Sequence, residues 1–140
     1  MARKMRSGAT VCFGAILVFA MACGTPVPEV PSEESVSYSM HLEPLVIAHC
    51  LSCHDSEEAK AKLVLDPGLG YERLVGPHSI QDPEMALVAP GDPEGSYLWL
   101  KLQHVTEKGK GMPRTPTGSK KLRESELELY RRWIEVGALP

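Results

Sequence analysis

The chain of 140 residues is long enough for one domain once an N-terminal targeting segment is set aside. Hydrophobic residues make up 43% and charged residues 24%, as in soluble globular proteins, but aromatic residues make up only 6%. The net charge of −3, without a Lys/Arg cluster interleaved with aromatic side chains, argues against nucleic-acid binding. A domain with so few aromatic residues would gain from a large apolar cofactor at its centre, because small chains bury little surface alone.

Residues 1–22 have the pattern of a secretory signal peptide. Three basic residues, Arg3, Lys4 and Arg6, precede an apolar run from Val11 to Ala20, and the Ala-Met-Ala step at residues 20–22 supplies small residues before a cleavage point. The apolar run is shorter than the roughly 20 residues that a transmembrane helix requires. The pattern therefore predicts export of the protein and removal of this segment.

Cys23 stands directly after the Ala-Met-Ala step and before Gly24, an arrangement similar to the lipobox of bacterial lipoproteins. We expect a lipid on Cys23, with a plainly cleaved signal peptide and a leftover cysteine as the alternative. Cleavage before Cys23 removes three basic residues and leaves 12 basic against 18 acidic ones, a net charge of −6. The expected product is a periplasm-facing, membrane-anchored lipoprotein, and Gly24 favours the outer membrane by resemblance to lipoprotein sorting rules.

Residues 23–39 are expected to form a lipidated, disordered tether. Residues 24–39 contain three prolines, four serines and three glutamates and almost nothing apolar. Sixteen residues of flexible chain reach on the order of 20 Å, enough to lift a domain off a membrane. The folded domain is then expected over residues 40–140.

The pattern of the remaining chain predicts an all-α domain with long loops. A first helix is expected to have Pro44 in its first turn and to continue into the segment around Cys50. A single helical turn is expected near residues 71–74. A second helix is expected to begin at Asp92, with three residues facing inward: Leu98, Leu102 and Val105.

The closing helix is the clearest predicted element. Ser125 is expected to cap it, Glu128 to complete a capping box, and Gly137 to end it. Its predicted apolar face consists of Leu127, Tyr130, Trp133 and Ile134. Several large side chains are expected in the core, where they would also surround a cofactor: Leu63, Tyr97, Trp99, Tyr130 and Trp133. No segment shows the sustained alternation that is typical of a strand.

Cys50, Cys53 and His54 form the most informative pattern, Cys-Leu-Ser-Cys-His. On a helix, residues spaced i, i+3 and i+4 project from one side. Two thiols placed in this way can form thioethers to the two vinyl groups of a haem, and the histidine can bind its iron from below. The pattern therefore predicts one covalently attached haem c.

Two other interpretations compete for the cysteine pair, a redox disulfide and half of a zinc site. A thioredoxin-type dithiol requires a βαβ neighbourhood, which the pattern does not predict. A zinc site requires a second Cys/His pair at matched spacing, whereas His78 and His104 each stand alone. Export to an oxidising compartment is compatible with covalent haem attachment, and no structural disulfide framework is needed.

Five segments together resemble planctomycete-type cytochrome C domains, which are class I-like mono-haem c-type cytochromes common in bacterial exported proteins and lipoproteins. They are PLVIAHCLSCHD, KLVLD, APGDPEGSYLWLKL, GMP and LRESELELYRRWIEVGA, and the resemblance extends over residues 42–138. The resemblance implies that the haem motif opens the domain. It also implies that a Met-Pro loop provides the second axial ligand and that the closing helix packs across the first.

Met112 is the predicted sixth ligand of the iron, opposite His54. It lies in a loop between Gly109 and Pro116, with polar neighbours that make a core role for its side chain unfavourable. A loop of this kind can place the thioether over the distal haem face, and His/Met ligation raises the redox potential. Three further candidates for this position remain open: His78, Met85 and His104.

With His54 and Met112 both bound to iron, no coordination position is left for a substrate. The expected function is therefore transfer of single electrons between redox partner proteins, by a carrier that is a monomer and is not an enzyme. The alternative is a haem-bearing accessory or sensor domain of a periplasmic enzyme system, which would require an open or labile sixth position. Whether Met112 binds the iron separates the two hypotheses.

Overall fold

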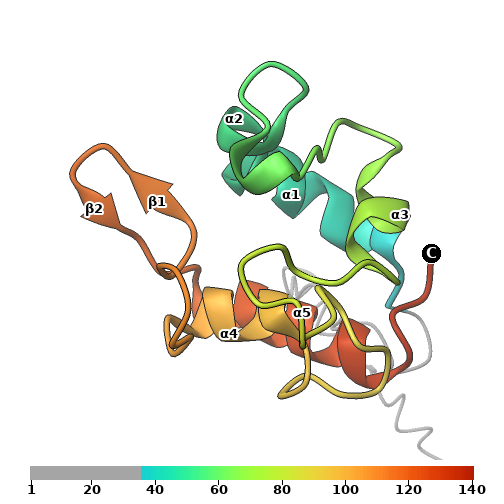
Figure 1. The fold of residues 1–140 in the computed structure, drawn as a ribbon. Helices are drawn as coiled ribbons and strands as arrows, with labels where there is room; N and C mark the ends of the chain where they lie inside the picture. The colour runs from blue at the N-terminus through green and yellow to red at the C-terminus, as the bar shows by residue number, and fades with distance from the viewer. Residues whose placement is uncertain (1–35) are drawn as a thin grey trace, which may run out of the picture.

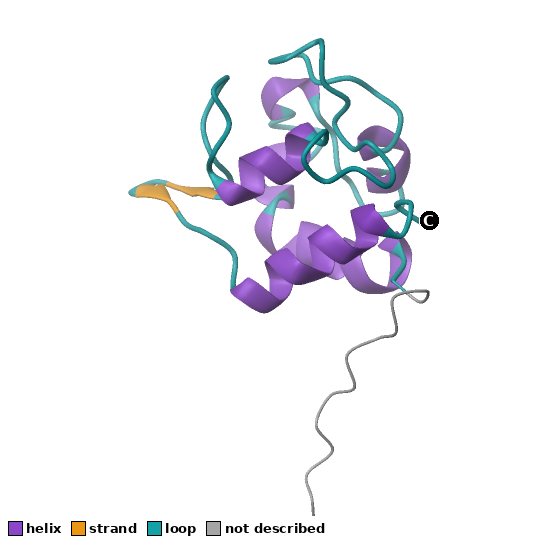
Figure 2. Ribbon diagram, turned by 90° about the horizontal axis from the view of Figure 1, so that it is seen from below, coloured by secondary structure: helices purple, strands orange, loops and turns teal. Residues whose placement is uncertain are grey.

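The computed structural model describes residues 36–140, so the expectations for the signal peptide, Cys23 and most of the tether lie outside the described residues. In this part of the chain no helix is long and apolar enough to cross a membrane. The fold is mostly helical with long irregular connections, as Figures 1 and 2 show, and the all-α prediction is confirmed at this level. The elements are a π-helix at Tyr38–Leu42 (η2), α1 (Glu43–His49), α2 (Leu51–His54), a 3₁₀ turn at Lys60–Lys62 (η3), α3 (Gly70–Leu74), α4 (Tyr97–Gln103), β1 (Arg114–Thr115), β2 (Gly118–Ser119) and α5 (Glu124–Glu135).

The ordered structure includes residues 36–39, which were expected to belong to the tether. Val36 is fully buried and Tyr38 is 3% exposed. The Tyr38 N–H donates to the Leu139 carbonyl (2.9 Å), and the Tyr38 ring lies 5.7 Å from the Trp133 ring. The expected boundary at Met40 is therefore wrong, because two apolar side chains in a Ser- and Glu-rich segment suffice to pair it with the C-terminal residues.

The helix that carries the Cys-Leu-Ser-Cys-His segment forms much as expected. Pro44 lies in the first turn of α1, where its missing N–H leaves no bond unmade, and Val46 is buried. The Cys50 N–H donates to the Val46 carbonyl (2.8 Å), and the Cys50 backbone (φ −119°) separates α1 from the short α2. The helix is thus divided at the first cysteine. The turn expected near residues 71–74 is present as α3.

Helix α4 begins at Tyr97, five residues later than expected. Asp92 does not cap a helix; its carboxylate accepts the Gly95 N–H (2.9 Å), and its carbonyl accepts the Ser96 hydroxyl (2.8 Å). These bonds stabilise a turn, and Ser96 itself has extended backbone. The local side-chain bonds of Asp and Ser compete here with helix formation.

The end of α4 corrects the prediction for Val105. His104 adopts the left-handed conformation (φ +63°) that ends the helix. Val105 therefore lies beyond α4 and is 63% exposed, although it was expected to face inward. Leu102 is 2% exposed, as expected, and Leu98 is half-buried.

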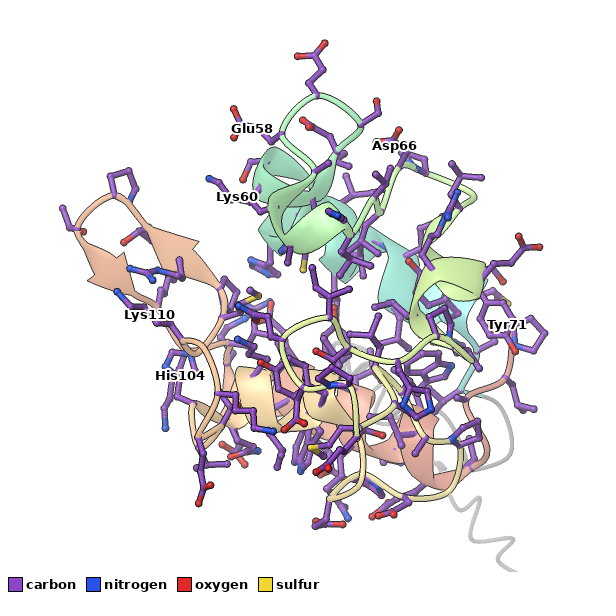
Figure 3. The ribbon with its side chains drawn as sticks, viewed as in Figure 1. Glu58, Lys60, Asp66, Tyr71, His104 and Lys110 are labelled. Carbon is purple, nitrogen blue, oxygen red and sulfur yellow. The ribbon has the colours of Figure 1, made fainter. Side chains whose placement is uncertain are left out.

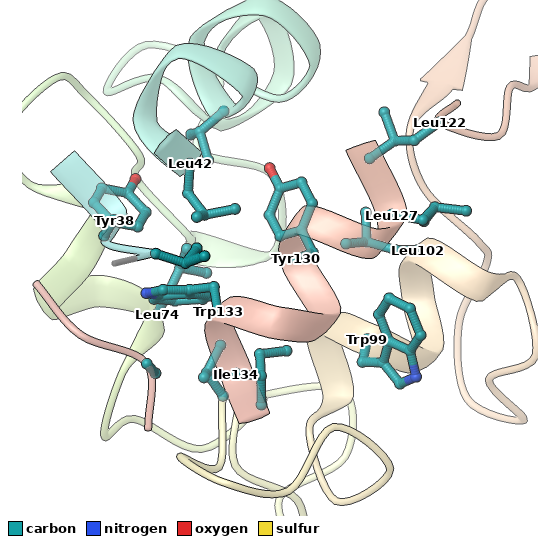
Figure 4. Packing of buried hydrophobic residues seen from close by; sticks show 14 of the residues in the cluster. Tyr38, Leu42, Leu74, Trp99, Leu102, Leu122, Leu127, Tyr130, Trp133 and Ile134 are labelled. Atoms are coloured by element: carbon teal, nitrogen blue, oxygen red, sulfur yellow. The ribbon is translucent and has the colours of Figure 1, made fainter. Parts of the chain in front are cut away.

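Helix α5 begins earlier than Ser125, the residue expected to cap it. Arg123 is the N-cap, and its backbone N–H donates to the Glu126 carboxylate (2.9 Å), so Glu126 takes the capping role that was expected of Glu128. Ser125 lies inside the helix. The expected inward face is confirmed and forms the centre of the core in Figure 4: Leu127, Tyr130, Trp133 and Ile134.

A short hairpin follows Met112, where the sequence predicts only a loop. Strands β1 and β2 pair in antiparallel register, with Arg114 opposite Ser119 and Thr115 opposite Gly118. The hairpin extends from the side of the domain, and the segment that enters it runs past the end of α4 (Figure 1). Two-residue strands are too short to carry the alternation by which a sequence reveals a strand.

Candidate functional site

A cavity of about 580 Å³ lies between the α1–α2 segment and the loop that enters β1. This volume is within the range of about 300–1,000 Å³ that is usual for ligand and cofactor sites. Its walls bring together segments that are distant in the sequence. The residues that line it are His49, Cys50, Ser52, Cys53, His54, Lys60, Leu63, Leu65, Leu98, Leu102, Met112, Pro113, Arg114, Thr115 and Pro116.

His54 ends α2 and is only 6% exposed. Its ring Nδ1 lies 3.2 Å from the Leu63 carbonyl, so Nδ1 carries the hydrogen and donates a hydrogen bond to that oxygen. Nε2 is then the nitrogen with a free electron pair. Burial lowers the pKa of His54, which favours the neutral ring. A neutral imidazole oriented by a backbone carbonyl is the usual form of a metal-binding histidine.

Cys50 and Cys53 are free thiols, half-buried at the cavity wall. Burial raises the pKa of the Cys50 thiol to about 11, so the thiol is protonated at neutral pH. Cys53 lies closer to a cation, because Lys60 Nζ is 3.5 Å from its Sγ. The two thiols and the His54 ring therefore border one cavity from a single helical segment.

Met112 borders the same cavity from a different part of the chain. Its N–H donates to the Lys101 carbonyl (2.9 Å), and its own carbonyl accepts a hydrogen bond from His104 Nε2–H (2.9 Å). Gly111 lies so close to His104 that a β-carbon there would be 2.4 Å from the imidazole Cγ. Figure 3 shows His104 and Lys110 at the end of α4 beside this loop. The end of α4 therefore holds the backbone of Met112.

The three other candidates for the sixth position do not border the larger cavity. His78 is exposed, with Nδ1 2.9 Å from the Pro83 carbonyl, and it lines a separate, smaller cavity. Met85 is half-buried and lines neither cavity. His104 uses Nε2 to hold the Met112 carbonyl. Only Met112 among the four candidates faces the cavity that the cysteines border.

The expected aromatic wall of this cavity is replaced by leucines. Tyr97, Trp99, Tyr130 and Trp133 are buried, as expected, but none of them lines the larger cavity. Of the five residues expected to surround a cofactor, only Leu63 lines this cavity. The apolar lining comes instead from Leu63, Leu65, Leu98 and Leu102.

His49 connects the cavity to helix α5. Its Nε2 lies 3.2 Å from the Glu126 carboxylate, whose side chain is 8% exposed. Arg123 also contacts this carboxylate, at 2.7 Å from its guanidinium. The hydrogen bond from Arg123 is the main reason that the pKa of Glu126 falls to about 2. A charged carboxylate therefore fixes the cavity wall to the N-terminus of α5.

The smaller cavity, of about 190 Å³, shares His54, Leu63 and Met112 with the larger one. It also contains Lys101, a buried lysine that sequence reasoning missed. The available signal was its position within YLWLKLQ, where a single cation interrupts an otherwise apolar stretch of α4. The remaining lining residues are Ala61, Lys62, Arg73, Pro77, His78, Ser79, Ile80, Gln81, Leu87 and Tyr97.

Comparisons with known proteins add no relatives to this description. No protein-family model matches the chain, and neither the curated proteins nor the solved structures yield a match to it. Within residues 36–140, no group of three or more His, Cys, Asp or Glu side chains is placed to hold a metal ion. The residues around the two cavities are therefore the guide to the function of the protein.

Proposed function

We propose that this protein is an exported mono-haem c-type cytochrome that transfers single electrons. The observation that carries the proposal is the position of four residues around one cavity, with Cys50, Cys53 and His54 on one side and Met112 on another. The thiols would hold the haem covalently, and the histidine and methionine would bind its iron. We also propose the kinship with planctomycete-type cytochrome C domains that the sequence motifs suggest.

The residues around the cavity fit a c-type haem in three respects. The volume of about 580 Å³ is that of a cofactor site, and four leucines give it the apolar lining that a porphyrin face requires. The His54 ring is buried and oriented by the Leu63 carbonyl, with Nε2 free. The Met112 thioether is carried by a loop whose backbone is held on both sides. The positions of His54 and Met112 support an iron bound by both residues.

A haem held in this way supplies reversible one-electron oxidation and reduction at its iron. The protein's own part is to exclude water with the leucine lining and to keep His54 and Met112 in place in both redox states. If His54 and Met112 both bound the iron, no coordination position would remain for a substrate, which favours a carrier over an enzyme. We further propose export through residues 1–22, lipid attachment at Cys23 and a periplasmic location with redox proteins as partners.

The test is an optical spectrum of the purified protein combined with removal of both thiols. We expect oxidised and reduced spectra of low-spin haem, and a haem that stays attached after denaturation. Cys50→Ala with Cys53→Ala should abolish the covalent attachment completely, whereas Ser52→Ala, between the two cysteines, should retain it. Covalent haem in the double variant would contradict the proposal. So would wild-type protein that contains no haem after it is produced together with the haem-attachment machinery.

A further inference from the structure

Lys101 is a buried ammonium without a counter-charge in the described part of the chain. The residue is 3% exposed. Its Nζ donates to the Lys110 carbonyl (3.0 Å) and lies 4.9 Å from the centre of the Tyr97 ring. No carboxylate of residues 36–140 is paired with it. A buried charge that lacks an opposite charge is strongly unfavourable, so the arrangement calls for an anion that the chain itself does not provide.

The cavity beside Lys101 has the character of an anion site. Lys62 and Arg73 also line it, and no Asp or Glu does. Neither Lys62 nor Arg73 takes part in an ion pair among the described residues. Three unpaired cations thus gather around about 190 Å³ in a chain whose net charge is negative. Lys62 and Arg73 are exposed, so Lys101 is the buried member of the three.

The position of this cavity relative to the cysteines identifies which anion fits. It shares His54, Leu63 and Met112 with the larger cavity but contains neither cysteine. A haem bound through its two vinyl groups has its two propionate carboxylates at the opposite edge of the ring. If a haem occupied the larger cavity, the edge turned away from Cys50 and Cys53 would lie toward the smaller cavity, because the two cavities share His54, Leu63 and Met112.

We propose that Lys101 binds a propionate carboxylate of the haem and that Arg73 and Lys62 complete the carboxylate site. This inference rests on the proposed function. The Tyr97 hydroxyl supports the site, because it donates to the Lys108 carbonyl (2.7 Å) and contacts Gln81 Oε1 (3.2 Å). The ammonium therefore sits in a fixed position among backbone and aromatic groups rather than at the end of a mobile side chain.

The pairing has a consequence for the redox potential. An ammonium next to a haem carboxylate offsets a negative charge close to the iron, and a low-dielectric surrounding strengthens the effect. Loss of the Lys101 charge leaves the carboxylate uncompensated and stabilises the more positive, oxidised iron. The midpoint potential should therefore fall when Lys101 becomes uncharged.

The experiment uses full-length holoprotein whose haem carries ¹³C in the propionate carboxyl groups, introduced through labelled 5-aminolevulinate. Redox-difference infrared spectra then report the labelled carboxylate directly. Lys101→Met keeps most of the side-chain length and removes the charge, Lys101→Arg keeps a charge, and Lys121→Met removes an exposed charge elsewhere. We expect Lys101→Met to shift the labelled band and lower the midpoint potential, Lys101→Arg to restore both in part, and Lys121→Met to change neither band nor potential.

An unchanged labelled band in haem-loaded Lys101→Met overturns the carboxylate assignment while leaving the proposed function in place. Added chloride or acetate at constant ionic strength provides a second test. If it changes the midpoint potential of the wild type while the labelled band in Lys101→Met is unchanged, the Lys101 ammonium binds a free anion instead of the propionate. If Lys101→Met does not load haem, Arg73→Met at an exposed position provides the same test on the second cation. Absence of covalent haem from the wild type overturns the proposed function itself.

Discussion

His104 Nε2 lies 2.9 Å from the carbonyl oxygen of Met112. The left-handed backbone of His104 ends α4 and turns its ring toward the loop, and the absence of a side chain at Gly111 leaves room for that ring. The Met112 N–H is held at the same time by the Lys101 carbonyl (2.9 Å). One residue therefore both terminates a helix and fixes the segment that carries the proposed sixth ligand.

Substitution of His104 should loosen the Met112 loop without changing the haem attachment. A hydrogen bond contributes about 0.5–1.5 kcal/mol, so His104→Leu should raise the open fraction of the loop roughly 2- to 12-fold. Carbon monoxide binding to the reduced protein should accelerate by a similar factor. His104→Gln, which retains a side-chain N–H donor, should recover part of the wild-type rate. Equal rates in wild type and His104→Leu would show that this contact does not hold the ligand.

Removal of the proposed thioether ligand should have a larger effect. Met112→Ala should open the iron to water or carbon monoxide, lower the midpoint potential and abolish the weak sulfur-to-iron charge-transfer band of the oxidised protein. Optical titration measures all three effects. Met85→Ala is the matched control, because Met85 lines neither cavity. A wild type that lacks the charge-transfer band, or that binds carbon monoxide readily when reduced, favours the accessory or sensor function.

Glu126 should make the stability of the domain depend on acid pH. Because the hydrogen bond from Arg123 lowers its pKa from 4.5 to about 2, the carboxylate stabilises the folded state fully above about pH 4.5. This stabilisation is lost as the pH falls toward 2. Urea unfolding of Glu126→Gln should therefore show a reduced free energy of unfolding at pH 7 and a shrinking difference from wild type between pH 4.5 and 2. A difference that is independent of pH would mean that the charge of Glu126 does not matter.

Lipid attachment is a prediction about residues outside those that the structure describes. Labelled palmitate should enter the wild type, and Cys23→Ala should release a soluble protein that still contains haem. The two properties separate because Cys23 lies 27 residues before Cys50, the first cysteine of the proposed haem site. Wild-type protein that fractionates as soluble and remains unlabelled would indicate an ordinary signal peptide.

The sequence alone was sufficient to predict the helices whose signals are local. Pro44 in the first turn of α1 and the 3.6-residue spacing of Leu127, Tyr130 and Ile134 depend on neighbours a few residues away, and both were confirmed. The side chain that caps α5 was misjudged by two positions. The cap is formed by the Arg123 backbone N–H and the Glu126 carboxylate. Because any residue has a backbone N–H, the residue type at the N-cap predicts this bond less well than it predicts a cap by a Ser or Thr side chain.

Contacts between distant residues were decided only by the tertiary structure. The sequence separates Tyr38 from Leu139 by about a hundred residues, so the backbone hydrogen bond between them has no local signal. The same holds for Lys101, whose burial next to His54 and Met112 follows from the way α4 packs and not from its neighbours in the chain. Residue types and short spacings predict which groups have the chemistry to bind a haem. Only long-range packing determines which of them border one cavity. A cavity is the space left between segments that pack together although they lie far apart in the chain.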